Sequence, residues 1–389
     1  MKILMIIPYY VPAYSYGGPV TVVKGLAEHL VMSGNKVTVL TTDVLDNDER
    51  IVKLHEVING VEVIRFRNIS NNMAKNYNLY LPIGMTSWLK SYINNYDLVH
   101  CHDFFTWLNY WACFFCRKYK VPYILQPHGC LSNTSIKSRF LFLKKLLLSF
   151  FKKTVQGAKF IIALAEKESD EIKTIYEECN DNICIIPNGI EISQIDKIEQ
   201  INLHDRFNIP QKHKIIIYLG RIQYIKGLDI SIQALANLKD KLLFTFLIVG
   251  PDEGEKPGLI KLIEEKGLSN KVIFTGILSG ENKIATLKGA DLFLLNSRSE
   301  GFGMTIIEAC ASNIPVLISN NCPIVEIELF QAGRITSNSI KDVSNNLNEM
   351  LENDDLLLFY KKNTRKVAEY YSLESSFRKI LALYDKSIS

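Results

Sequence analysis

Two carboxylates, Glu300 and Glu308, bracket a Gly-x-Gly loop in the C-terminal half of the chain. The sequence after Gly303 is apolar and free of helix breakers, which predicts a helix whose first N–H groups have no intrahelical partner. Such a helix start binds phosphate readily, and the glycines let the backbone approach a ligand closely. Ionised carboxylates accept hydrogen bonds from sugar and ribose hydroxyls. The spacing favours a nucleotide sugar, although a solvated surface helix with two glutamates would show the same spacing.

A loop with two cations, Arg221 and Lys226, is bracketed by Gly220 and Gly227 and follows an apolar strand predicted at 215–218. Arginine supplies a fixed fork of donors and lysine a mobile point charge, so together they can neutralise a diphosphate. Loop cations are often merely solvated. The glycines and the position after a strand make phosphate binding the better interpretation.

Two further motifs follow strands in the first half of the chain. Gly17-Gly18 stands just after the first strand and before a helix, where a phosphate contact and a plain tight turn are both compatible with the sequence. The Gly-x-Gly-x-x-Gly pattern is missing there, which disfavours a nicotinamide enzyme. His128, in Gln126-Pro127-His128-Gly129, ends another strand, and structural and functional roles are equally compatible with it.

Strand-length apolar runs alternate with amphipathic helical segments such as 20–33 throughout the chain, which predicts an α/β fold with parallel sheets covered on both faces. A chain of 389 residues exceeds what one core usually holds. Two doubly wound domains are therefore expected, meeting near 188–212. The predicted strands are 2–8, 36–41, 61–66, 98–102, 123–127, 160–164 and 183–187, then 215–218, 244–249, 272–275, 292–295 and 316–319.

Charge is distributed unevenly along the chain, although the net charge is only +4. Residues 1–190 hold 21 Lys/Arg against 16 Asp/Glu, and residues 104–165 contain ten cations and no acid. This asymmetry indicates an anionic partner for the first half. Nucleic acid is disfavoured, because no stacking-aromatic or recognition-helix pattern accompanies the basic residues.

The eight cysteines are scattered, and the one CxxC motif, Cys113 to Cys116, has no second pair to complete a zinc site. Free thiols in a reducing cytoplasm are the expected state. The short apolar run at the first strand is too short for a signal-peptide core, and no apolar stretch is long enough to span a bilayer. A cytoplasmic protein is expected.

Taken together, these motifs resemble glycosyltransferase family 4, whose members are retaining enzymes of the GT-B fold. The resemblance runs from Met1 to about Tyr371. It implies an acceptor-binding Rossmann-like domain over 1–187, a donor-binding one over 188–372, and a C-terminal helix at 373–389 that packs back on the first domain. Its matching motifs are Gly17-Gly18, His128-Gly129, Pro187-Asn188-Gly189-Ile190, Gly220-Arg221 with Lys226-Gly227, Val249-Gly250, Phe274-Thr275-Gly276 and Glu300 to Glu308.

The resemblance also implies roles for individual residues. Arg221 and Lys226 would hold the donor diphosphate, and Glu300 and His128 would contact the transferred sugar. These four are the predicted catalytic residues. Glu308 would bind the ribose. The remaining predicted contacts are Gly18, Gly303, Met304 and Thr305 with the phosphates, and Tyr16, Gly17 and His102 with the acceptor.

The implied reaction is transfer of a hexosyl unit from a UDP- or GDP-linked donor to a glycan acceptor in bacterial-type cell-surface polysaccharide biosynthesis, such as lipopolysaccharide or capsule. The acceptor is expected to be lipid-linked. No metal or other cofactor is expected, because two cations and a helix N-terminus serve the phosphates. Two alternatives remain open. One is an epimerase or a non-transferring sugar-nucleotide binding protein, and the other is a glycoside hydrolase using Glu300 and Glu308.

Residues 137–153 show helical amphipathicity, with lysines in one sector and phenylalanines and leucines opposite. Such a helix either covers the first sheet or lies at an anionic membrane surface, which would make the protein peripheral at the inner face of the membrane. At the end of the chain, 366–371 and 375–385 are predicted to be helical with a break near Ser372.

Overall fold

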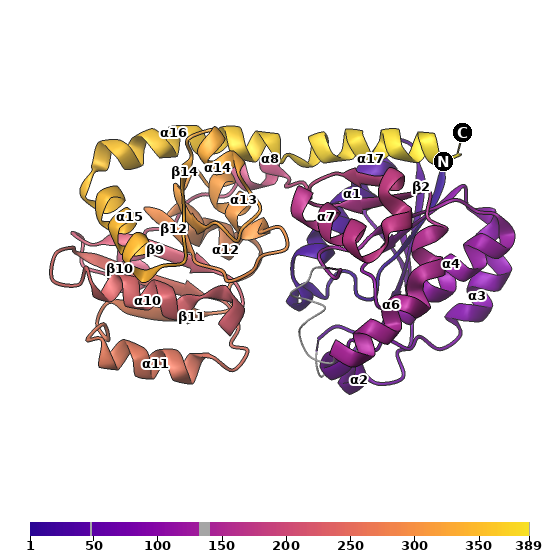
Figure 1. Cartoon of the computed structure of the whole chain (residues 1–389), viewed down its shortest axis with the longest axis horizontal. Helices are drawn as coiled ribbons and strands as arrows, with labels where there is room; N and C mark the ends of the chain where they lie inside the picture. Colours follow the sequence, from indigo (N-terminus) through magenta and orange to yellow (C-terminus); the bar gives the residue numbers. More distant parts are fainter. Residues whose placement is uncertain (47–48, 132–140, 389) are drawn as a thin grey trace. The chain divides into compact units, whose positions relative to one another are not determined.

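The computed structural model describes residues 1–46, 49–131 and 141–388 and contains two α/β units (Figure 1). The first unit comprises Met1–Gly189 together with Leu373–Ser389, and the second comprises Ile190–Ser372. The chain therefore leaves the first unit, builds the second, and returns for its last helix.

The first unit is built on an eight-stranded sheet with the order β3-β4-β2-β1-β5-β6-β7-β8. Neighbouring strands pair in parallel except β3 and β4, which form an antiparallel hairpin. Asn59 and Gly60 join these two strands, and both have positive φ, as a two-residue hairpin turn requires. The strands are β1 (Lys2–Ile6), β2 (Lys36–Thr42), β3 (His55–Ile58), β4 (Val61–Phe66), β5 (Leu98–His102), β6 (Tyr123–Gln126), β7 (Phe160–Ala163) and β8 (Ile183–Ile185).

Helices cover both faces of this sheet, because its central strands β5 and β6 are buried along their whole length and apolar residues pack on both faces. The helices are α1 (Gly18–Met32), α2 (Asn71–Tyr77), α3 (Met85–Tyr92), α4 (Trp107–Tyr119), α6 (Leu141–Gln156), α7 (Glu166–Ile175) and α17 (Leu373–Ile388), with 3-10 turns η1 (Tyr14–Tyr16), η2 (Ile93–Asn95) and η3 (Glu177–Asn182).

The C-terminal helix α17 belongs to the first unit. Phe377, Ile380 and Tyr384 are buried in the same cluster as Ile3 and Val23. Figure 1 shows α17 beside α1, and the two helices are in contact. Since α16 ends at Tyr370 and α17 begins at Leu373, the helix break expected near Ser372 is present.

The second unit holds a six-stranded parallel sheet with the order β11-β10-β9-β12-β13-β14. Strands β10, β12 and β13 are buried along their whole length, as expected for a sheet covered on both faces. The strands are β9 (Lys214–Leu219), β10 (Phe244–Val249), β11 (Val272–Gly276), β12 (Leu292–Leu295), β13 (Val316–Ser319) and β14 (Gly333–Thr336). The sequence did not predict the edge strands β3 and β14, because both are short and carry charged residues.

In the second unit a helix connects each strand to the next one along the chain, and further helices precede β9 and follow β14 (Figure 1). They are α8 (Ile192–Asp196), α9 (Leu203–Arg206), α10 (Leu228–Ala236), α11 (Lys256–Glu265), α12 (Gly280–Lys288), α13 (Met304–Ala311), α14 (Glu326–Leu329), α15 (Ile340–Glu352) and α16 (Asp354–Tyr370), with the 3-10 turn η4 (Tyr224–Lys226).

Each sheet has a point where the chain reverses its direction of growth. In the first unit it lies between β1 and β5, and in the second between β9 and β12. Open α/β sheets bind ligands beyond the carboxyl ends of strands at such points. The loops that follow β5, β9 and β12 therefore stand where ligand contacts are expected.

The helix predicted at 137–153 corresponds to α6, which begins at Leu141. Residues 137–140 and the side chains of 141–146, with Lys144 and Lys145, lie outside the described part of the chain. Farther along α6, Phe151 is buried whereas Phe150 is 42% exposed. Among the described residues, every helix is too short or too polar to cross a bilayer.

Candidate active site

The loop after β9 carries Arg221 and Lys226 and packs closely on neighbouring loops. A Cβ at Gly227 would lie 2.0 Å from the carbonyl oxygen of Asn296, which follows β12. A Cβ at Gly250 would lie 1.9 Å from the carbonyl oxygen of Gly220. These two glycines are therefore required by backbone packing at the strand ends, in addition to any ligand approach.

Lys226 and Glu300 meet directly. The Lys226 ammonium lies 2.6 Å from Glu300 Oε2, which also accepts a hydrogen bond from the Ser297 hydroxyl at 3.2 Å. Lys226 is on η4 after β9, and Glu300 is on the loop after β12, so adjacent strands bring the two predicted residues together. Arg221 is more exposed, and its guanidinium lies 3.1 Å from Glu253 Oε1.

Helix α13 begins immediately after Gly303, whose φ of 87° lies in the left-handed region. Met304 and Thr305 occupy its first turn, where backbone N–H groups have no intrahelical acceptor. The sequence prediction of a helix start at this position is therefore correct. The positive end of the helix adds to the two cations and favours an anion.

Glu308 lies one turn into α13, where Lys283 of α12 holds its Oε1 at 2.6 Å. The other oxygen, Oε2, is buried and accepts no hydrogen bond from the described residues. A buried carboxylate oxygen without a donor is costly, so it is well suited to a ligand hydroxyl. Lys283 was not predicted from the sequence, because a lysine on a polar helix does not stand out before its neighbour is known.

Arg298 braces the loop that carries Lys226. Its guanidinium donates to both carboxylate oxygens of Asp229 at 2.8 and 2.7 Å and to the carbonyl oxygen of Tyr224 at 2.7 Å. It also stacks on the Tyr224 ring, 3.9 Å from the centroid. Because Tyr224 and Lys226 share η4, Arg298 fixes the segment from which the Lys226 ammonium extends. Arg298 is not among the residues predicted from the sequence.

Three histidines form a row in the first unit. His100 and His102 lie on β5 with ring centroids 4.0 Å apart, and His102 Nδ1 lies 3.1 Å from Nε2 of His128, which follows β6. Tyr384 of α17 bonds His100 Nδ1 at 2.6 Å. Burial lowers the pKa of His100 to about 3 and that of His128 to about 4, and it also lowers the pKa of His102. All three imidazoles are therefore neutral near pH 7.

The loop that precedes α1 carries the predicted phosphate and acceptor contacts of the first unit. Tyr16 ends η1 and stacks on Tyr9, with centroids 4.4 Å apart. Burial raises the pKa of the Tyr16 phenol. Gly17 has a φ of 90°, which glycine adopts without strain, and α1 begins at Gly18.

The described structure thus gathers the predicted residues into two groups, one in each unit. Arg221, Lys226, Glu300, Glu308 and the start of α13 lie around the carboxyl ends of β9 and β12. The residues at the strand ends of the first unit are Tyr16, Gly17, Gly18, His102 and His128.

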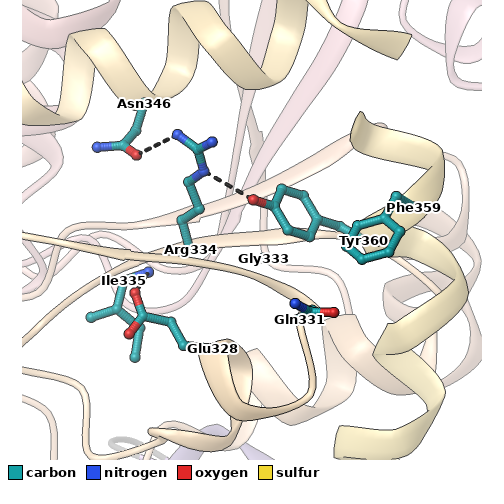
Figure 2. Close-up of a pocket in the computed structure, with 8 residues that line it drawn as sticks. All are labelled: Glu328, Gln331, Gly333, Arg334, Ile335, Asn346, Phe359 and Tyr360. Carbon is teal, nitrogen blue, oxygen red and sulfur yellow. Dashed lines mark hydrogen bonds between the residues drawn. The ribbon is translucent and has the colours of Figure 1, made fainter. Parts of the chain in front are cut away.

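A cavity of about 350 Å³ lies elsewhere, at the edge strand β14 (Figure 2). Its central cation, Arg334, bonds Tyr360 and Asn346, as Figure 2 shows, and is also held by both oxygens of Glu349. The guanidinium is largely satisfied by protein groups, and none of the predicted site residues lines this cavity. We assign no ligand to it.

Metal-ligating side chains do not converge in the part of the chain that the structure describes: no three His, Cys, Asp or Glu residues there are placed to hold an ion. The seven cysteines recorded among the described residues are free, including Cys113 and Cys116. Independence from metal stays a prediction.

Comparison with known proteins decides the family. The model for glycosyl transferases group 1 matches residues 199–367, and the model for Glycosyltransferase Family 4 matches residues 16–194. The chain is a family 4 glycosyltransferase. Each model covers most of one of the two Rossmann-like units.

Relatives of this glycosyltransferase agree with that assignment. An uncharacterized glycosyltransferase of Methanocaldococcus jannaschii is 28% identical over 341 residues, covering 84% of this chain and 82% of its own. The structure of Anabaena HepE with UDP-glucose has a TM-score of 0.76 at 18% identity and covers 99% of this chain and 100% of its own. WaaG, a glycosyltransferase involved in lipopolysaccharide biosynthesis, has a TM-score of 0.71 at 19% identity, covering 98% and 99%. The fold of the glycosyltransferase is thus GT-B, as the sequence predicted.

Proposed function

We propose that this glycosyltransferase moves a hexosyl unit from a UDP- or GDP-linked donor to a glycan acceptor with retention of anomeric configuration. One observation carries the proposal: two cations, a helix N-terminus and two glutamates converge at the carboxyl ends of β9 and β12. This is the arrangement a sugar diphosphate requires. The presence of UDP-glucose in the Anabaena neighbour supports a nucleotide-sugar donor.

In this proposal the two cations, Arg221 and Lys226, stabilise the leaving group. Cleavage of the bond between the anomeric carbon and the diphosphate leaves negative charge on the phosphate oxygen. Arg221, Lys226 and the N–H groups at the start of α13 stabilise that charge, and such electrostatic stabilisation is usually the largest single contribution to catalysis. The predicted phosphate contact of Gly18, at the start of α1, belongs to the same proposal. Lys283 holds one oxygen of Glu308, so the buried second oxygen is oriented toward the ribose hydroxyls.

The proton of the acceptor hydroxyl is transferred to the leaving group. The acceptor hydroxyl forms the new bond to the anomeric carbon and gives its proton to the departing phosphate oxygen on the same face, which retains the configuration. Glu300 accepts hydrogen bonds from the sugar hydroxyls rather than attacking the anomeric carbon. His128 contacts the transferred sugar, and Tyr16, Gly17 and His102 bind the acceptor.

One assay separates this reaction from its rivals. The purified protein is incubated with a panel of UDP- and GDP-sugars, and nucleoside diphosphate release is measured with and without glycan acceptors. A transferase releases diphosphate with acceptor present, whereas an epimerase converts the donor without releasing it. A hydrolase acts on glycans with no nucleotide. Acceptor-independent conversion or hydrolysis as the only activity would refute the proposal.

The acceptor we propose is a lipid-linked glycan at an anionic membrane surface. Trp111 and Phe114 of α4 and Phe150 of α6 are 37 to 42% exposed. The Tyr110 ring connects them. It stacks on the Phe150 ring with centroids 4.5 Å apart, and its centroid lies 5.4 Å from that of the Trp111 ring. Four exposed lysines lie on or beside the same helices, and 104–165 contains no acid. These lysines are Lys118, Lys120, Lys152 and Lys153.

Amphipathic aromatic rings and lysines suit the interface of an anionic bilayer, where each basic residue adds about 1 kcal/mol. The test is co-sedimentation with anionic and neutral vesicles at low and high salt. Trp111→Ser with Phe114→Ser, and the four lysines changed to Gln, should each weaken binding to anionic vesicles. Phe359→Ser, an equally exposed aromatic of the second unit, is the control. If all variants bound anionic vesicles equally well, α4 and α6 would only cover the sheet and would not contact a membrane.

A further inference from the structure

The turn that carries His128 has an unusual backbone. His128 and Gly129, directly after Pro127 and β6, have φ values of 53° and 84°. Two successive residues in the left-handed region are uncommon, and the first carries a Cβ, which makes that region costlier than it is for glycine. Such a conformation persists only where surrounding contacts enforce it.

A buried carboxylate on α7 supplies one of those contacts. Glu168 is 3% exposed, and its Oε1 accepts a hydrogen bond from the Gly129 N–H at 2.6 Å. Its Oε2 accepts from the N–H of Leu164, just after β7, at 2.7 Å. One side chain thus ties the turn after β6 to the end of β7. Hydrogen bonds between an ionised carboxylate and backbone N–H groups are among the stronger ones in proteins.

Strand β5 holds the same turn from the other side. His102 Nδ1 bonds His128 Nε2 at 3.1 Å, and Asp103 Oδ1 accepts from the Cys130 thiol at 2.8 Å. Strands β5 and β7 are the two neighbours of β6, and the turn is held from β5 and Asp103 on one side and from α7, which follows β7, on the other. On the β7 side, Glu168 provides the contact to the Gly129 N–H.

We propose that Glu168 is a positioning residue for sugar transfer, whose carboxylate holds the His128–Gly129 turn in the conformation that presents His128 to the transferred sugar. This inference rests on the proposed function, in which His128 contacts that sugar. Glu168 itself is buried, and both of its oxygens are directed at backbone N–H groups, so it acts through the turn and not on the substrate.

The two acceptor oxygens explain why a carboxylate is needed. Glutamine has nearly the same volume but replaces one oxygen by an NH₂ group, which would face the N–H of either Gly129 or Leu164. Glu168→Gln therefore loses one of the two hydrogen bonds while filling the same space. Glu166→Gln, an exposed change on the same helix, is the matched control.

The decisive structural readout is the Gly129 amide. His128-Gly129 is the one His-Gly pair in the sequence, so protein labelled with ¹³C-carbonyl histidine and ¹⁵N-glycine gives a single correlated amide signal. We expect this signal downfield and slow to exchange in the wild type, shifted in Glu168→Gln and unchanged in Glu166→Gln. A Gly129 amide that exchanges as fast as an exposed loop in the wild type would overturn the proposal even if every Glu168 variant failed to fold.

The functional readout is steady-state transfer. Because the proposed diphosphate contacts lie in the second unit, Glu168→Gln should lower kcat about 10- to 100-fold and leave the affinity for free UDP or GDP within twofold. Glu168→Asp, whose side chain is one methylene shorter, should have a kcat between those of the wild type and Glu168→Gln. If the folded Glu168→Gln protein shows a shifted Gly129 signal but keeps the wild-type kcat, the proposal is refuted. Full kcat in His128→Ala instead refutes the sugar contact assigned to His128, whatever Glu168 does to the turn.

Discussion

The ammonium of Lys226 lies 2.6 Å from Oε2 of Glu300, with both side chains largely buried between the loops after β9 and β12. The same two residues are proposed to receive the diphosphate and the sugar of one donor. A diphosphate placed beside Lys226 would compete with Glu300 for the ammonium. Glu300 would then be free to accept hydrogen bonds from the sugar hydroxyls, so the ion pair couples donor binding to sugar orientation.

Lys226→Ala and Arg221→Ala should each lower turnover about 10²-fold or more, the usual scale for losing an electrostatic donor to the transition state. Their effects on folding should differ. Lys226→Ala leaves the largely buried Glu300 without its cation, whereas Arg221 is mostly exposed and its loss costs little stability. Kinetics and urea unfolding of both variants, with exposed Lys261→Ala as control, measure the two effects. Near-normal turnover in both folded variants would contradict the proposal that Arg221 and Lys226 bind the donor diphosphate.

Glu308→Ala should weaken binding of the nucleotide about 10- to 100-fold, because a hydrogen bond to a charged group contributes roughly 1.5–3 kcal/mol. Lys283→Met should weaken it less, since Glu308 keeps its charge but loses the contact that orients it. Calorimetric titration with UDP and GDP gives both affinities. If Lys283→Met binds nucleotide as the wild type does, the Lys283–Glu308 pair is only structural.

Arg298→Lys should lower kcat about tenfold, because lysine cannot reproduce the bidentate bond to Asp229 or the stacking on Tyr224. The loss should act through Lys226. In a Lys226→Ala background, Arg298→Lys should therefore cost much less than it does alone. A double-mutant cycle on kcat/KM measures this coupling, and strictly additive effects would show that Arg298 does not position Lys226.

Transfer activity should survive an excess of chelator, because in the proposed mechanism the two cations and the start of α13 stabilise the charge on the leaving diphosphate without a metal ion. The measurement is diphosphate release in EDTA, followed by addition of Mg²⁺ or Mn²⁺. Loss of activity in EDTA with recovery on adding either ion would contradict this mechanism.

The sequence located the loops of the proposed donor site in the second unit, because glycines, cations and carboxylates there follow apolar strands that the structure also contains. Gly303 has positive φ and is followed by α13, which agrees with the predicted loop-to-helix transition, and Gly227 also has positive φ and precedes α10. The residues that brace those loops were not foreseen. Arg298, Asp229 and Lys283 acquire their importance from partners far away in sequence, and a single sequence does not show which polar side chains will meet.

In the first unit, too, the sequence alone did not show which polar side chains would meet. His128 was noticed because it follows a strand, whereas Glu168 was not noticed, because a glutamate in a polar helical segment gives no sign of being buried. Its burial follows from the tertiary packing of α7 against the ends of β6 and β7. Likewise, the Tyr384–His100 contact joins residues 284 positions apart and depends on the return of α17 to the first unit.

The row of His100, His102 and His128 should make stability depend on pH. Folding lowers the pKa of His100 to about 3 and that of His128 to about 4, against about 6.5 in the unfolded chain, and it lowers the pKa of His102 as well. Between pH 6.5 and 4 the unfolded chain thus binds more protons at these sites. Their contribution to stability is complete above pH 6.5 and is lost as the pH falls toward 4.

Each such histidine should contribute about 1.4 kcal/mol per pH unit over most of that window. Buried Asp103 and Glu168, whose pKa values are raised, act in the opposite direction, so a difference between variants is the sound measure. Urea unfolding at pH 7, 6 and 5 should show a steeper loss of stability in the wild type than in His128→Gln. His55→Gln, which changes an exposed histidine, should match the wild type. Parallel pH profiles for His128→Gln and the wild type would mean that His128 takes up a proton as easily when folded as when unfolded.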